Sequence, residues 1–220
     1  PAVTNGVTME YALRLDYWDI IIMQGNPFEI AGNRASIEGD IKTIQNYVRE
    51  KCLNPNVKFA WHMDWATPTD NDLRDTYTLP GVNPYYKNYE AFGDDRTTMY
   101  KSIVNTVQTK IVTNETFQFV IPTATAMENA LSSYLEEKDI HRDYGHATDM
   151  TRVMNSYVWF CRVFGIEQLN EIKMDTIPVK FFRSTKDIQD RVLTEAEKAI
   201  ILESVNNALK TPFAMTQSQY

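Results

Sequence analysis

Three short and nearly continuous apolar runs, each followed by a helical pattern, constrain the fold of this chain more than any other feature. The runs cover residues 18–23, 57–61 and 117–121. Apolar residues at almost every position predict strands that are covered on both faces. Strands that alternate with helices need crossover connections, and these are typical of a parallel sheet. We therefore predict that the three runs are parallel neighbours in an α/β domain with helices on both faces.

Helical periodicity follows each of these runs. Apolar spacing predicts helices over residues 37–52, 99–114, 127–134 and 150–161. Gly165 is expected to end the last of these helices. Thr194 and Glu197 have the spacing of a capping box, which predicts a further helix that ends near Leu209.

The length of 220 residues and the hydrophobic content of 43% suit one domain with a sizeable core. We expect an α/β domain over residues 1–165 and a C-terminal appendage over residues 166–220 that packs on it and carries no chemistry. Residues 166–192 look irregular, with one short strand expected at residues 179–182. Cys52 and Cys161 are expected to be buried free thiols.

Charge excludes some classes of partner. The formal net charge is −7 and there is no block of Lys or Arg, which argues against a surface that binds nucleic acid or an anionic membrane. No apolar run approaches the roughly 20 residues of a membrane span. The first residues do not show the pattern of a signal peptide.

Asp143 and His146 are the main candidates for chemistry. An Asp three residues before a His, in a turn that contains Gly145, can supply two members of a hydrolytic triad. The Asp orients the imidazole, which then takes a proton from a hydroxyl nucleophile. The pattern is short, and an incidental surface turn is the alternative. No preceding segment looks like the nucleophile. His141, two residues before Asp143, is expected to be solvated.

Polar residues also gather where the expected strands end. Ligands of open parallel sheets bind beyond the carboxyl ends of the strands. This edge would bring together Gln24, Asn26, His62, Asp64, Trp65 and Thr125. Polar residues reappear at strand ends in any protein, so this grouping has a structural alternative. A metal site is disfavoured because His62, Asp64, Asp143 and His146 lack a recognised ligand spacing, and no cofactor is expected.

The segment that follows the second strand is long and aromatic. Residues 65–94 are expected to run over the carboxyl edge of the sheet, because long loops in compact domains are usually functional. Flat rings beside a polar crevice would suit sugar rings, although a locally packed flap is an equal alternative. The rings concerned are Trp65, Tyr77, Tyr85, Tyr86 and Tyr89.

With these residues considered together, the chain resembles the SGNH (GDSL-like) hydrolase superfamily, and more closely a bacterial branch known as a domain of unknown function and found in exported proteins. The resemblance runs from about Thr8 to the C-terminus. It rests on residues 18–24, 61–66, 99–104, 120–126, 142–146 and 193–198.

The resemblance implies a three-layer αβα fold with a parallel, flavodoxin-like sheet. It assigns His146 as general base, Asp143 as its orienting partner, and Gln24 as an oxyanion donor, with Asn26 as the competing candidate. The superfamily's serine block and first two strands have no counterpart here, because the chain begins about where the third strand is expected. A missing N-terminal segment of the same protein would supply them, and a naturally degenerate domain that lacks them is the alternative.

Two functions follow as expectations. The first is a serine ester hydrolase, exported, that removes acyl groups from carbohydrate and uses a serine from upstream sequence; this chain alone would be nearly inert. Residues His62, Asp64, Trp65 and Thr125 are expected to bind substrate. The second is a non-catalytic module of the same fold that binds glycan or protein.

Overall fold

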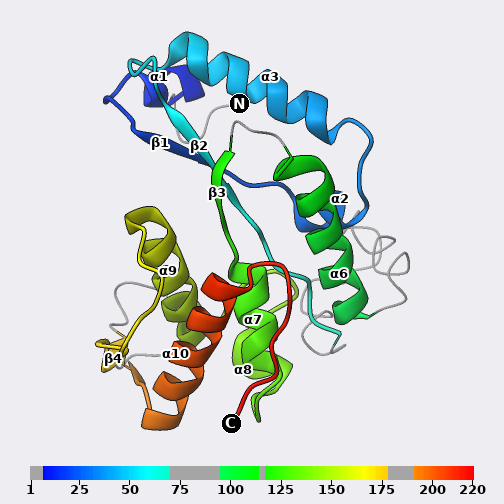
Figure 1. Ribbon diagram of the computed structural model, residues 1–220, viewed down its shortest axis with the longest axis vertical. Coiled ribbons are helices and arrows are strands. Elements are labelled where there is room, and N and C mark those ends of the chain that lie inside the picture. Colours follow the sequence, from blue (N-terminus) through cyan, green and yellow to red (C-terminus); the bar gives the residue numbers. More distant parts are fainter. Residues whose placement is uncertain (1–6, 70–94, 114–116, 178–190) are drawn as a thin grey trace.

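The computed structural model has a parallel sheet at its centre (Figure 1). It describes residues 7–69, 95–113, 117–177 and 191–220. The strands of the sheet are β1 (Ile20–Met23), β2 (Lys58–His62) and β3 (Phe117–Ile121). They lie in the order β1-β2-β3, and both pairs are parallel. The prediction that the three apolar runs are parallel neighbours is confirmed.

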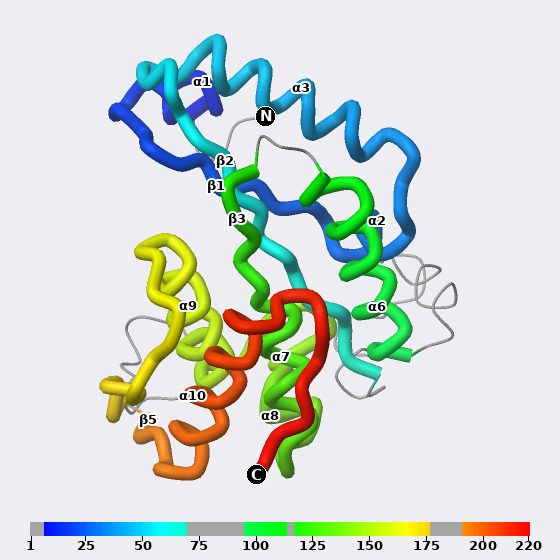
Figure 2. Tube along the Cα trace, viewed as in Figure 1, coloured from blue at the N-terminus to red at the C-terminus, as the bar shows by residue number. Residues whose placement is uncertain are grey.

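Helices cover both faces of the sheet, as Figures 1 and 2 show. One group consists of α1 (Met9–Leu13), α2 (Pro27–Ala31), α3 (Ile37–Lys51) and α6 (Arg96–Thr106), which continues as a π-helix, η1 (Val107–Ile111). The other consists of α7 (Thr123–Leu131), α8 (Glu137–Ile140), α9 (Asp149–Phe164) and α10 (Glu195–Lys210). The result is the three-layer αβα arrangement, with further helical structure at the C-terminal end.

Strand side chains alternate between two apolar clusters, one for each helical layer. Met23, Phe59 and Trp61 pack with the first group of helices. Ile121 is buried in the cluster of the second group, and Ile22 packs against it. Because successive residues of a strand face opposite sides, strands that are apolar at nearly every position suit a sheet with helices on both faces.

Several helix ends agree with the sequence. Gly165 closes α9 with a left-handed φ of 69°, a conformation that glycine adopts readily. Thr194 and Glu197 form the capping box that opens α10. The helix expected over 127–134 begins earlier and ends at Leu131. It stops there because the hydroxyls of Ser132 and Ser133 donate to carbonyls one turn back. Tyr134 therefore lies beyond the helix.

The C-terminal part packs against the second helical layer. Ile200, Ile201 and Val205 of α10 are buried in the same cluster as α7 and α9. Two short strands, β4 (Thr176–Ile177) and β5 (Arg191–Val192), pair antiparallel, whereas the strand expected at 179–182 lies outside the described residues. Cys161 is buried and Cys52 partly buried, and both are free thiols.

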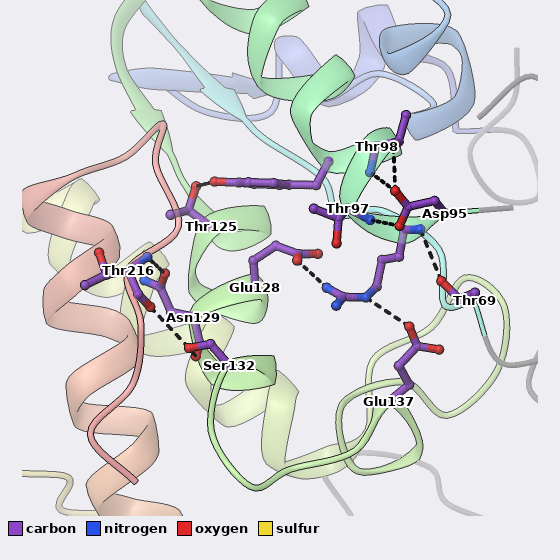
Figure 3. A network of polar contacts seen from close by, with 12 residues as sticks. Thr69, Asp95, Thr97, Thr98, Thr125, Glu128, Asn129, Ser132, Glu137 and Thr216 are labelled. Carbon is purple, nitrogen blue, oxygen red and sulfur yellow. Dashed lines mark hydrogen bonds and ion pairs between the residues drawn. The ribbon is translucent and has the colours of Figure 1, made fainter. Parts of the chain in front are cut away.

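A polar network joins helices of both layers to the C-terminal tail (Figure 3). Arg96 of α6 donates to Glu128 of α7 and, at 2.9 Å, to Glu137 of α8. The backbone N–H of Thr216 donates to the side chain of Asn129 at 2.7 Å. In the part of the chain that the structure describes, no helix is long and apolar enough to cross a membrane.

Candidate functional site

Asp143 and His146 lie in a tight turn between α8 and α9. The imidazole Nδ1 of His146 is 2.7 Å from Asp143 Oδ1. The same oxygen accepts the backbone N–H groups of Gly145 at 3.0 Å and of His146 at 2.9 Å. The hydrogen bond predicted between these two side chains is therefore confirmed.

Backbone hydrogen bonds on both sides hold this turn. His141 and Ala147 form an antiparallel bridge. The N–H of Arg142 donates to the carbonyl of His146 at 2.8 Å, and that of Thr148 donates to the carbonyl of Ile140 at 3.0 Å. Thr148 then caps α9. The turn is thus fixed at its base by two paired segments, with the Asp and His side chains at its tip.

The two side chains differ in exposure, and this difference suits a general base. The side chain of Asp143 is 10% exposed and that of His146 is 50% exposed. Burial alone would raise the pKa of Asp143, but hydrogen bonds from Gly145 and from the His146 imidazole outweigh it and hold the pKa below its usual range. An ionised Asp143 keeps the proton of His146 on Nδ1 and leaves Nε2 as a proton acceptor.

His146 borders a pocket of about 510 Å³. The residues that line it are His62, Trp65, His146, Ala147, Arg152, Asn155, Ser156 and Trp159. The ring of His62 lies against both tryptophans, with its centroid 5.0 Å from Trp159 and 6.3 Å from Trp65. The pocket therefore combines a candidate base with two aromatic walls.

The ends of β1 and β2 meet beside this pocket. Gln24 Oε1 is 2.7 Å from His62 Nδ1, and Gln24 Nε2 donates to Asp64 Oδ2 at 2.8 Å. His62 Nε2 is 2.7 Å from the hydroxyl of Thr123, which follows β3. Gln24 does not line the pocket, but it contacts His62, which does. The strand-end residues thus come together as the parallel topology requires.

Burial controls the ionisation of His62 and Asp64. It lowers the pKa of His62 to about 4, so this histidine is neutral at physiological pH. Burial raises the pKa of Asp64 to about 6, although hydrogen bonds from the Trp65 backbone and from Gln24 oppose the shift. His62 is therefore a hydrogen-bonding group in this site and carries no charge there.

Gly25 follows Gln24 at a place with no room for a side chain. A Cβ atom at this position would lie 2.5 Å from Cδ1 of Ile30 and 3.4 Å from Trp61. The absence of a side chain thus lets α2 pack closely on β2.

Two of the expected site residues lie elsewhere. Asn26 caps α2, because its side-chain oxygen accepts the backbone N–H of Phe28 at 3.0 Å. Thr125 is buried on α7, where its hydroxyl lies 3.0 Å from that of Tyr100 (Figure 3). It donates to the carbonyl of Pro212 at 2.5 Å. Neither residue lines the pocket. Of the aromatic segment, Trp65 lines the pocket, whereas Tyr77, Tyr85, Tyr86 and Tyr89 lie outside the described residues.

Helix α9 contributes to the pocket in a way that the sequence pattern did not predict. Arg152, Asn155 and Trp159 share one face of this helix and line the pocket. Their spacing could have indicated this, because residues three and four positions apart lie on the same face of a helix. The helix that carries them begins shortly after His146. The apolar residues that predicted this helix, among them Val153 and Val158, form its other, buried face.

The expectation that His141 is solvated is wrong. This residue is 1% exposed, and neither of its ring nitrogens has a hydrogen-bond partner within the described part of the chain. The bridge to Ala147 turns this stretch of chain inward, next to the buried Ile140. Burial lowers the pKa of His141 to about 3; nearby Arg96 lowers it further and Asp143 opposes the shift.

We predict that His141→Leu stabilises the protein by about 1–2 kcal/mol at pH 7. A buried imidazole that finds no hydrogen-bond partner among the described residues is replaced by an apolar side chain of similar size. The native imidazole binds a proton only below about pH 3, whereas the unfolded one binds it below about 6.5. Native stability is therefore lost as the pH falls below 6.5. The gain in the variant should increase between pH 6.5 and pH 4. Urea unfolding at both pH values measures it, and a loss of stability would refute this account of His141.

No group of three or more His, Cys, Asp and Glu side chains among the described residues is arranged to hold a metal ion.

Comparisons with known proteins identify the family. A solved structure, the crystal structure of a DUF4886 family protein from Bacteroides uniformis ATCC 8492, is similar with a TM-score of 0.68. It is 20% identical in sequence, and the match covers 97% of this chain and 71% of that chain. No curated protein matches. The model of the family described as "Domain of unknown function (DUF4886)" matches residues 2–188. The chain therefore belongs to the DUF4886 family.

Proposed function

We propose that the protein is an ester hydrolase of the SGNH type that removes acyl groups from carbohydrate. His146 is the general base and Asp143 its orienting partner. The observation that carries this proposal is the 2.7 Å bond from His146 Nδ1 to the buried carboxylate of Asp143, with the imidazole half-exposed at a pocket. We also propose that the protein is exported, as in the bacterial branch that the sequence resembles.

In the proposed reaction, His146 Nε2 takes the proton of a serine hydroxyl as its oxygen attacks the ester carbonyl. The imidazolium then gives this proton to the departing sugar oxygen, and the acyl group stays on the serine. Water repeats the sequence, deprotonated by the same nitrogen, and releases the acid. Asp143 keeps Nδ1 protonated and stabilises the imidazolium that forms in each half-reaction. The nucleophilic serine belongs to a segment of the protein outside this chain.

Gln24 is the proposed side-chain donor to the developing oxyanion. Such a donor typically contributes on the order of 3 kcal/mol. Its carboxamide bonds to His62 and Asp64, which restrict its orientation. Asn26 is the competing candidate: its side-chain oxygen caps α2, and its Nδ2 group is the donor that would face the oxyanion.

Trp65 and Trp159 support carbohydrate as the substrate. Aromatic rings offer flat apolar surfaces to the C–H faces of sugars, and polar groups around the rings bind hydroxyls. Here the polar groups of the same pocket include Arg152, Asn155 and Ser156. His62, Trp65 and Trp159 line the same pocket as the proposed base.

The alternative function is a non-catalytic module that binds glycan through the same pocket. One observation favours it: Ser156, whose side chain lines the pocket, donates its hydroxyl to the carbonyl of Arg152 at 2.7 Å within α9. This serine is therefore not aimed at the imidazole of His146 as a nucleophile would be.

The full-length gene product tests the choice between the two functions. It should hydrolyse p-nitrophenyl acetate and acetylated oligosaccharides. Trp159→Ala should raise KM for the oligosaccharide about tenfold, since loss of one aromatic wall removes about 1.5 kcal/mol of apolar contact. Trp18→Ala is the matched control. Trp18 precedes β1 at the amino ends of the strands, whereas His62 of the pocket is at the carboxyl end of β2. Sugar binding without hydrolysis of either ester would support the alternative, and unchanged KM in Trp159→Ala would exclude this wall from the sugar site.

A further inference from the structure

Four side chains at the strand ends form one continuous row of hydrogen bonds. The row runs from Asp64 to Gln24 at 2.8 Å, from Gln24 to His62 at 2.7 Å, and from His62 to Thr123 at 2.7 Å. The hydroxyl of Thr123 also lies 2.8 Å from the carbonyl of Met63, which accepts the N–H of Ala124 as well. Each member touches the next, so the donor and acceptor roles along the row are linked.

An ionised Asp64 sets one direction for the row. A carboxylate can only accept, so the Gln24 Nε2 group donates to it and Gln24 Oε1 faces His62. A neutral imidazole has one donor and one acceptor nitrogen. His62 then carries its proton on Nδ1 and donates to Gln24, while Nε2 accepts the hydroxyl of Thr123. Every polar atom of the row has a partner.

A protonated Asp64 satisfies the same atoms in the opposite direction. Its hydroxyl donates to Gln24 Oε1 after the carboxamide turns over, and Gln24 Nε2 then donates to His62 Nδ1. The proton of His62 moves to Nε2 and is donated to the Thr123 oxygen. The Thr123 hydroxyl donates in turn to the carbonyl of Met63. All partners are retained, so the two arrangements are alternatives of one network.

We propose that Asp64 and His62 are positioning residues for Gln24: the protonation of Asp64 decides which end of the carboxamide faces His62 and which nitrogen of His62 carries the proton. The consequence of this positioning for catalysis rests on the proposed function, in which Gln24 donates to the oxyanion. The coupling itself depends only on the row of hydrogen bonds.

The groups around Asp64 and His62 allow Asp64 to change its protonation near pH 6. Burial raises the pKa of Asp64 to about 6 and lowers that of His62 to about 4, so Asp64 changes charge while His62 stays neutral. On the pocket side of His62, the charged or titratable groups are His146 and Arg152. On the side of Asp64, the lining residues are Gly25, Pro27, Ile30, Trp61 and Ile103, none of which titrates.

The test is the tautomer of His62, followed by ¹H–¹⁵N correlation of the imidazole nitrogens in the ¹⁵N-labelled chain from pH 5 to pH 8. The protonated nitrogen should change from Nε2 at pH 5 to Nδ1 at pH 8, without conversion to imidazolium. Asp64→Asn should make the tautomer independent of pH, because the titrating group is gone. Gln24→Leu should do the same, because the row is interrupted. Backbone spectra verify that both variants are folded.

Asp143→Asn is the matched control, because it removes a carboxylate next to the pocket that is not in the row. It should leave the change at His62 intact. A single tautomer of His62 in the wild type across this range, or a pH-dependent change that persists in Asp64→Asn, would overturn the proposal. Because no substrate is present, the coupling can fail while ester hydrolysis stands, and ester hydrolysis can fail while the coupling stands.

Discussion

Replacing Arg96 by methionine should cost about 3–5 kcal/mol of unfolding free energy. Arg96 lies between two carboxylates, those of Glu128 on α7 and Glu137 on α8. The side chain of Glu128 is 4% exposed and that of Arg96 is 16% exposed. Removal of one partner leaves a charge in the core without compensation, and this is strongly destabilising. Burial raises the pKa of Glu128 and Arg96 opposes that shift, so the variant would hold Glu128 either unpaired or protonated.

Urea unfolding at pH 7 measures this loss. The double variant Arg96→Met with Glu128→Gln should recover part of the stability, because the uncompensated charge is then absent. Arg34→Met is the matched control: Arg34 and its partner Glu29 are 45% and 47% exposed, so its loss should cost less than about 1 kcal/mol. A similar small loss in Arg96→Met would show that this network does not stabilise the core.

His146→Ala should lower ester hydrolysis by the full-length gene product about 10⁴-fold or more. Losses of triad members have effects of this size, because nucleophile, base and orienting group act as a unit. The effect should fall on kcat, since the imidazole acts on the proton that moves in the transition state. Asp143→Ala should produce a smaller but still large loss, and the double variant should be little worse than His146→Ala alone.

His141→Leu provides the control for this experiment, because it removes a different histidine close in sequence that does not line the pocket. Its activity should stay within about threefold of the wild type. An active His146→Ala enzyme, or equal losses in both variants, would show that His146 is not the base.

The fold was largely predictable because its signals are local. Strands such as Ile20–Met23 are apolar on both faces, and only a sheet covered on both sides can bury them. Capping signals such as Thr194 with Glu197 act within four residues, so the sequence alone locates them. The end of α7 was not predictable from apolar spacing, because the hydroxyls of Ser132 and Ser133 compete for its backbone carbonyls and leave no mark on that spacing.

The site was predictable only in part. Asp143 and His146 interact within one turn, and their hydrogen bond followed from their spacing. The contacts of His62 with Gln24 and Trp159 join residues 38 and 97 positions apart, and such pairings depend on how the layers pack. The burial of His141 was missed for another reason: a bridge to Ala147, six residues later, holds it beside the buried Ile140.

The measurement that tests the central claim most directly is the reaction of the full-length gene product with a fluorophosphonate, followed by mass spectrometry of the labelled peptide. A base such as His146 activates a serine toward this reagent. The proposal predicts one labelled serine, with labelling slowed at least about 100-fold in His146→Ala and unaffected in His141→Leu. Absence of a labelled serine in the wild type, or equal labelling in His146→Ala, would contradict the assignment of His146 and Asp143 as a hydrolytic pair.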